Sequence, residues 1–200
     1  MAKAMTDLDR RRRRRKRRLV SLVFYVIVAV GLAWFFESQA TTTIIFVRHA
    51  EKALDGSDDP SLSPAGQRRA AELTRQMVDA DVVAGVDALY ATEYRRTRET
   101  IEPLARILDL DINEYDSGDT EQVLETILKR HKGKIILVVG HSDTIPQLIA
   151  NLGASKSVPP IADEEYDNIY LISIPWFGKT KTIRLRYGEP YMAAAAALSS

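Results

Sequence analysis

The sequence predicts an α/β domain in which a mostly parallel sheet carries helices on both faces, giving three layers, with one transmembrane helix ahead of it. Strand and helix patterns alternate beyond residue 40, which is typical of α/β folds. The run 135–139 is entirely apolar, as expected for a central parallel strand that is buried on both faces. Residues 19–36 carry no charge, which indicates the membrane helix.

The N-terminal region has the composition of a membrane anchor. Residues 10–18 are nine consecutive cations, and the 18 residues that follow are uncharged. A helix of that length spans about 27 Å, close to the thickness of the hydrocarbon core. Trp34 lies at the far end, where interfacial aromatic residues gather, and the cations favour the cytoplasmic side. We therefore expect a basic cytoplasmic tail over 1–18, a single span or uncleaved signal anchor over 19–36, and a domain on the periplasmic side.

Three other interpretations of this region are less favoured, and the weakest is a buried core helix, which would rarely follow nine cations. A cleaved signal peptide, with release of the domain after cleavage near Ala40, would also explain an apolar run after cations, but this run exceeds the usual h-region of about 7 to 15 residues. A nucleic-acid-binding tail would not adjoin a membrane-like segment directly. Beyond residue 40 the chain holds 18 Lys and Arg against 24 Asp and Glu, a net charge of −6, so we expect no nucleic-acid partner.

The domain is expected to span residues 41–187, with a C-terminal tail over 188–200. Ser63 fits a helix N-cap and Pro64 the first helical position. Pro103 lies inside a later helical pattern, which must tolerate or kink around it. In chain order, the predicted strands are 43–47, 86–90, 112–115, 135–139, 169–174 and 182–185, and the last two form a hairpin. The predicted helices between them are 62–80, 95–108, 120–131 and 145–152.

Two histidines stand directly after predicted strands. His49 and Arg48 end the first strand, and His141 follows the run 135–139. Ligands of open α/β sheets bind at the carboxyl ends of the strands. Arginine binds tetrahedral oxyanions through paired hydrogen bonds, and a neutral imidazole can attack phosphorus if a backbone carbonyl holds its other nitrogen. Together with the arginine-rich segment 91–100, these residues predict a phosphate pocket.

Simpler explanations apply to single residues. A lone histidine at a strand end is normally structural, and His131 fits a solvated helix C-terminus. The chain has no cysteine, which excludes disulfides, thiolate zinc sites and cysteine nucleophiles. We expect no metal and no cofactor, because neither strand-end histidine has a third ligand at helical spacing. The acidic segment 164–168 is interpreted as a rim loop or a solvated turn, whose carboxylates would repel phosphate.

Four segments resemble the histidine phosphatase superfamily, also called phosphoglycerate-mutase-like, in a small branch with an N-terminal anchor. Arg48-His49-Ala50-Glu51 is similar to the family's "RHG" signature, and "LSPAGQ" over 62–67 resembles its "LTxxGxxQA" element. "ATEYRRTRET" over 91–100 resembles "SSPLxRAxQT", and "VVGHSDT" contains the second histidine. The four segments follow one another in the family's order. Ala50, Glu93-Tyr94 and Ser142-Asp143 depart from the family pattern without removing a phosphate ligand.

The resemblance implies roles for particular residues. His49 would be the nucleophile that becomes phosphohistidine, while Arg48, Arg96 and His141 would hold the phosphoryl oxygens without a metal. Glu114, in an "ExxxG" segment, would be the general acid, with Asp116 or Asp143 as alternatives, or no acid at all. Glu51 and Ser142 would line the substrate pocket.

The sequence therefore predicts a metal-independent phosphomonoesterase, whose substrate is a small phosphate ester or a phosphorylated protein side chain. A phosphomutase is the less favoured enzyme, because a domain of this length leaves little chain for a lid that excludes water. A noncatalytic, membrane-tethered phosphate-binding module is the alternative of another class.

Overall fold

The chain forms two compact units, residues 1–39 and 40–200. The computed structural model describes residues 7–37, 41–79, 85–155 and 158–191. The first unit is helix α1, Asp7–Glu37. Its segment Arg12–Phe35 has a mean hydropathy of 2.1 and is long and apolar enough to cross a membrane. The expected N-terminal apolar helix is thus present.

The second unit has the predicted order of strands and helices. The elements are β1 (Thr42–Arg48), α2 (Pro64–Asp79), β2 (Ala88–Thr92), α3 (Arg95–Leu108), β3 (Ile112–Tyr115), α4 (Thr120–Arg130), β4 (Ile135–Gly140), α5 (Thr144–Asn151), β5 (Asn168–Ile174) and β6 (Lys181–Arg186). Strand β2 begins and ends two residues later than expected, and the other bounds agree within one or two residues.

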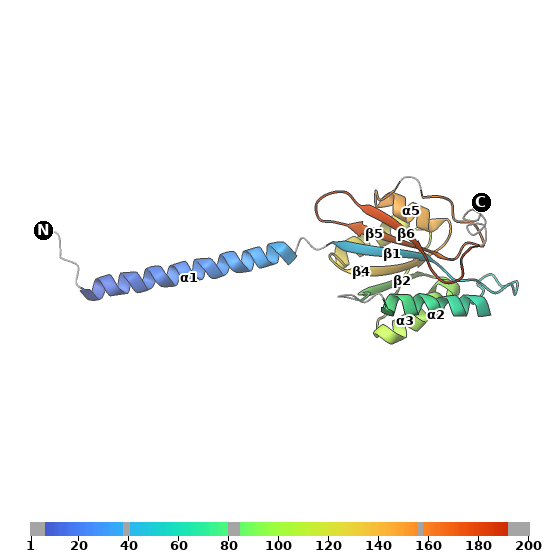
Figure 1. The fold of residues 1–200 in the computed structure, drawn as a ribbon, viewed down its shortest axis with the longest axis horizontal. Coiled ribbons are helices and arrows are strands. Elements are labelled where there is room, and N and C mark those ends of the chain that lie inside the picture. Colours follow the sequence, from blue (N-terminus) through green and yellow to red (C-terminus); the bar gives the residue numbers. More distant parts are fainter. Residues whose placement is uncertain (1–6, 38–40, 80–84, 156–157, 192–200) are drawn as a thin grey trace. The chain divides into compact units, whose positions relative to one another are not determined.

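One six-stranded sheet organises this unit, in the order β3-β2-β4-β1-β5-β6 (Figure 1). Strands β1 to β4 are parallel, and β5 and β6 form an antiparallel hairpin beside β1. The apolar strand β4 lies between β1 and β2, as its sequence predicted. The mostly parallel α/β class is therefore confirmed.

The sheet separates two hydrophobic cores, because successive side chains of a strand point to opposite faces. Ile44 and Phe46 of β1 pack on the side of α4 and α5, whereas Ile45 and Val47 pack on the side of α2 and α3. All four are buried. The runs without polar residues in β1 and β4 thus reflect helices on both faces.

Local chemistry fixes the start of α2. The Ser63 hydroxyl accepts from the Gly66 amide at 3.1 Å, which is the predicted N-cap. A Cβ on Gly66 would lie 2.2 Å from the Glu51 carbonyl oxygen, so only glycine lets the helix approach the segment that follows β1. Helix α3 continues through Pro103.

Candidate active site

The two strand-end histidines meet at the carboxyl end of the sheet. Arg48 pairs with Gly140 in the β1–β4 register, and the His49 amide donates to the Gly140 carbonyl at 3.0 Å. The rings of His49 and His141 have their centroids 5.3 Å apart. A pocket of about 560 Å³ opens there, lined by Arg48, His49, Lys52, Tyr94, Arg96, Ser117, Gly118, His141, Ser142, Asp143, Thr144 and Asp163.

Backbone contacts fix the tautomer of His49. Its Nδ1 lies 2.8 Å from the Ala50 carbonyl oxygen, and because a carbonyl only accepts, Nδ1 carries the proton. The Ala50 amide in turn donates to the Thr100 hydroxyl at 2.9 Å. Burial lowers the pKa of His49 to about 3, and the nearby cations contribute. The ring is therefore neutral at physiological pH, with its Nε2 lone pair available.

His141 is held by hydroxyl groups. Its Nε2 lies 3.0 Å from the Thr92 hydroxyl, which lies 2.9 Å from the Thr97 hydroxyl. The His141 amide donates to the Thr144 hydroxyl at 3.0 Å. Burial, followed by the charge of Arg96, lowers the pKa of His141 to about 4. This second imidazole is neutral as well, and its position is fixed by β2 and α5.

Each pocket arginine lies on a tyrosine ring. The Arg48 guanidinium lies 4.2 Å from the centroid of Tyr166, and that of Arg96 lies 4.3 Å from the centroid of Tyr94. Burial lowers the pKa of Arg48 from its usual value. The Nε atoms of both arginines are buried without a hydrogen-bond acceptor among the described residues. Unpaired buried donors are costly, and an oxyanion would supply the acceptors that they lack.

The acidic segment 164–168 positions Arg48. Arg48 Nη1 donates to the carbonyl oxygens of Ala162 at 2.7 Å and Glu165 at 3.2 Å. The carboxylates of Glu165 and Asp167 bind Arg186 at 3.1 Å and 2.7 Å. The alternative of a solvated turn was therefore wrong for these two residues, because they are buried and their charges are neutralised by β6.

Tyr166 lies against both His49 and Arg48 and was not identified from the sequence. Its ring centroid is 5.9 Å from that of His49. No periodicity or motif marks a tyrosine in this loop, and only the fold brings it to the end of β1. His131 is the C-cap of α4, as expected, and its ring is only partly exposed, because its Nε2 is hydrogen bonded to the Tyr90 hydroxyl at 2.9 Å.

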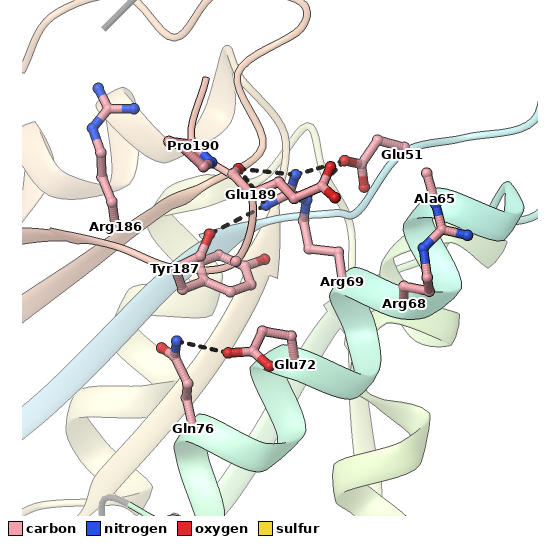
Figure 2. A pocket seen from close by; sticks show the side chains of 11 residues that line it. Glu51, Ala65, Arg68, Arg69, Glu72, Gln76, Arg186, Tyr187, Glu189 and Pro190 are labelled. Carbon is pink, nitrogen blue, oxygen red and sulfur yellow. Dashed lines mark hydrogen bonds and ion pairs between the residues drawn. The ribbon is translucent and has the colours of Figure 1, made fainter. Parts of the chain in front are cut away.

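The remaining predicted site residues have different surroundings. Ser142 lines the pocket of His49. Glu51 instead binds Arg69 at 2.8 Å and lines a second pocket, over α2 and the segment 186–190 (Figure 2). Glu114 lies in β3 and pairs with Arg98. It is not among the residues that line the pocket of His49.

The two alternative acids are also held by local bonds. Asp116 accepts from the Gly118 amide at 2.8 Å. Asp143 accepts from the Thr144 amide at 2.9 Å at the start of α5, and it lines the pocket. Within the described part of the chain, no group of three or more potential His, Asp or Glu ligands could hold a metal ion.

Comparisons with known proteins agree with this geometry. The model of the histidine phosphatase superfamily (branch 1) matches residues 44–121, which include β1, His49 and Arg96. No curated protein matches the sequence significantly.

Several solved structures share the fold. The protein histidine phosphatase SixA, in complex with tungstate, is 18% identical to this chain, with a TM-score of 0.57 over 72% of this chain and 96% of that chain. A mycobacterial glucosyl-3-phosphoglycerate phosphatase with inorganic phosphate is 11% identical, with a TM-score of 0.56 over 74% and 97% of the two chains. A phosphoserine phosphatase from Entamoeba histolytica is 15% identical, with a TM-score of 0.50 over 73% and 96%.

At these identities the likeness to solved structures is one of fold, and the family model adds the likeness in sequence around the first histidine. The order of the four sequence segments, the sheet topology and the meeting of His49 with His141 agree with this likeness. Residues 44–121 are thus similar in sequence to the histidine phosphatase superfamily, and the domain shares its fold with solved histidine phosphatases.

Proposed function

We propose that the domain is a phosphatase that hydrolyses its substrate through a phosphohistidine on His49. The observation that carries the proposal is the hydrogen bond from His49 Nδ1 to the Ala50 carbonyl, which leaves Nε2 unprotonated in a pocket with two arginines. Phosphoryl transfer requires an aligned nucleophile and cations around the equatorial oxygens. Arg48 and Arg96 supply such cations from protein side chains.

The reaction would proceed in two displacements. The Nε2 lone pair of His49 attacks phosphorus, the P–N bond forms, and the bond to the leaving atom breaks with its electron pair. The leaving group takes up a proton. Water then attacks phosphorus, the P–N bond breaks, and its electron pair returns to Nε2 while the water loses a proton to solvent. Arg48, Arg96 and His141 would contact the phosphoryl oxygens in both steps.

The surroundings of the pocket favour substrates with a good leaving group. Of the described carboxylates, Asp143 and Asp163 line it, and Asp143 is engaged at the start of α5. Glu114 is engaged by Arg98 outside it. A phosphohistidine side chain needs no enzymatic acid, because its ring can take a proton from water before the P–N bond breaks. Phosphohistidine side chains of proteins are therefore our first candidate substrates, and other phosphorylated side chains and small phosphate esters are the second.

We also propose that α1 anchors the domain as a single span, with the N-terminus in the cytoplasm and the domain on the periplasmic side. The nine cations before the apolar segment support this orientation. Protease added outside intact spheroplasts should then release or digest the domain. Full protection would contradict the orientation.

The activity can be tested with the full chain in lipid vesicles. A phosphohistidine peptide, a phosphoserine peptide and p-nitrophenyl phosphate would be compared for phosphate release by the wild type and by His49→Ala. We expect turnover that His49→Ala abolishes. Phosphate binding without turnover by the wild type would instead support the noncatalytic module, and equal rates for the two proteins would contradict the role of His49.

A further inference from the structure

The tip of the β5–β6 hairpin exposes two aromatic side chains. Trp176 is 54% exposed and Phe177 is 86% exposed, and their ring centroids lie 6.5 Å apart. Neither belongs to the hydrophobic cores of the described domain. Exposed apolar patches that are rimmed by polar residues mark protein–protein or membrane interaction sites.

Cations surround this tip. Lys179 and Lys181 follow the aromatic pair and are exposed. The turn between α4 and β4 adds exposed Arg130 and Lys132, whereas Lys134 is paired with Asp87 at 2.9 Å. Aromatic rings beside lysines and arginines are the composition of protein segments at the interface of an anionic bilayer.

Both segments lie where β1 begins. The β1–β5 register pairs Thr42 with Ile174, so the hairpin tip extends beside the start of β1, as Figure 1 shows. The Gly133 amide donates to the Thr42 hydroxyl at 2.9 Å, which places the α4–β4 turn there as well. The basic turn and the aromatic tip therefore flank the first residues of the domain.

The chain itself limits how far this end can lie from the apolar helix. Helix α1 ends at Glu37 and the next residue that the structure describes is Thr41, so four virtual bonds join these two residues. At about 3.8 Å each, they span at most about 15 Å. The length of this connection allows the start of β1 to come close to a bilayer that holds α1.

We propose that Trp176, Phe177, Lys179 and Lys181, with Arg130 and Lys132, form a docking face that inserts its aromatic tip into the interface of an anionic bilayer. This inference rests on the proposed membrane span. The active site lies at the opposite end of β1, roughly 20 Å away for a strand of this length. Docking would orient the pocket away from the lipid, toward phosphorylated groups in the aqueous phase.

The absence of cysteine from the chain makes the test direct. Phe177→Cys and Leu54→Cys would each be labelled with an environment-sensitive fluorophore in the full chain, reconstituted in vesicles that contain phosphatidylglycerol. Leu54 is a matched control because it is 94% exposed and follows the opposite end of β1. Quenching by spin-labelled lipid would be compared with quenching by aqueous iodide.

We expect lipid quenching at position 177 to be several-fold stronger than at position 54, and to fall in Lys179→Glu/Lys181→Glu while phosphatase turnover is unchanged. Equal lipid quenching at the two positions would overturn the docking face. A label at 177 that is shielded from both quenchers would also overturn it, in favour of a protein partner. Vesicle flotation separates the two proposals. Protein that floats with the vesicles but shows no excess lipid quenching at position 177 would support the membrane span and contradict the docking face. Protein that does not float would contradict both.

Discussion

The two ends of β1 differ in chemistry although one strand joins them. At the carboxyl end, His49 is buried with its Nδ1 bonded to a carbonyl, and the Nε of Arg48 is buried without an acceptor. At the amino end, the nearby aromatic and basic side chains are exposed. The parallel sheet explains the difference, because it gathers the strand ends that precede helices at one edge and leaves the other edge for turns. The proposed catalysis and the proposed membrane attachment would therefore depend on separate residues.

The largest difference in kcat/KM is expected between variants of the two histidines that lie at opposite ends of the sheet. His49→Ala should lower kcat/KM by at least about 10⁴-fold, because it removes the proposed nucleophile. His131→Gln, at the amino end, should change it less than about threefold. Steady-state assays of both variants in vesicles check this. If both variants lost kcat/KM to a similar extent, the proposed difference in function between the two ends of the sheet would be wrong.

Arginines provide the next contrast. Arg96→Ala should reduce kcat/KM by roughly 100- to 1,000-fold, the loss seen when one donor to a developing oxyanion is removed. Arg130→Ala at the amino end and Arg98→Ala on the same helix as Arg96 are matched controls that should retain activity. If Arg96→Ala lowered kcat/KM tenfold or less, Arg96 would not contact the transferred phosphoryl group.

The fold was largely predictable from the sequence. Strands β1 and β4 appear as apolar runs because helices cover both faces, and Ser63 with Pro64 marks the start of α2. The placement of His49 beside His141 followed from the rule that parallel strands share a carboxyl edge.

The surroundings of the site were less predictable, because long-range contacts create them. Arg186 lies 19 residues from Asp167, and its ion pair turns an acidic segment into a support for Arg48. Glu114 has the spacing of a family acid, but Arg98 on the neighbouring helix engages it. Neither pairing leaves a periodic signal in the sequence.

Acid should lower the free energy of unfolding of the domain through the two pocket histidines. Both pocket histidines stay neutral when folded, with pKa values of about 3 and about 4, whereas unfolded histidine has a pKa near 6.5. Below about pH 6.5 the unfolded chain binds more protons, so the free energy of unfolding falls as the pH drops, by up to about 1.4 kcal/mol per pH unit for each histidine. Urea unfolding from pH 7 to pH 5 measures this slope. His49→Gln/His141→Gln should flatten it, and an unchanged slope would contradict burial of the neutral rings.

The smallest effect is expected at Thr92, which positions His141 from the end of β2. Thr92→Val removes the hydroxyl 3.0 Å from His141 Nε2 and should lower kcat/KM roughly tenfold, because a displaced imidazole aligns poorly. Thr92→Ser should restore most of the activity, since it returns the hydroxyl. Failure of serine to rescue would mean that Thr92 acts through packing alone.

The central claim is that His49 carries the phosphoryl group during turnover. Full-length protein in vesicles would be mixed with substrate, quenched in alkali to preserve any P–N bond, and digested for mass spectrometry. The account predicts an acid-labile phosphoryl group on the peptide that contains His49, which appears during turnover and disappears when substrate is exhausted. Rapid phosphate release with the phosphoryl group on another residue, or turnover that persists in His49→Ala, would contradict it.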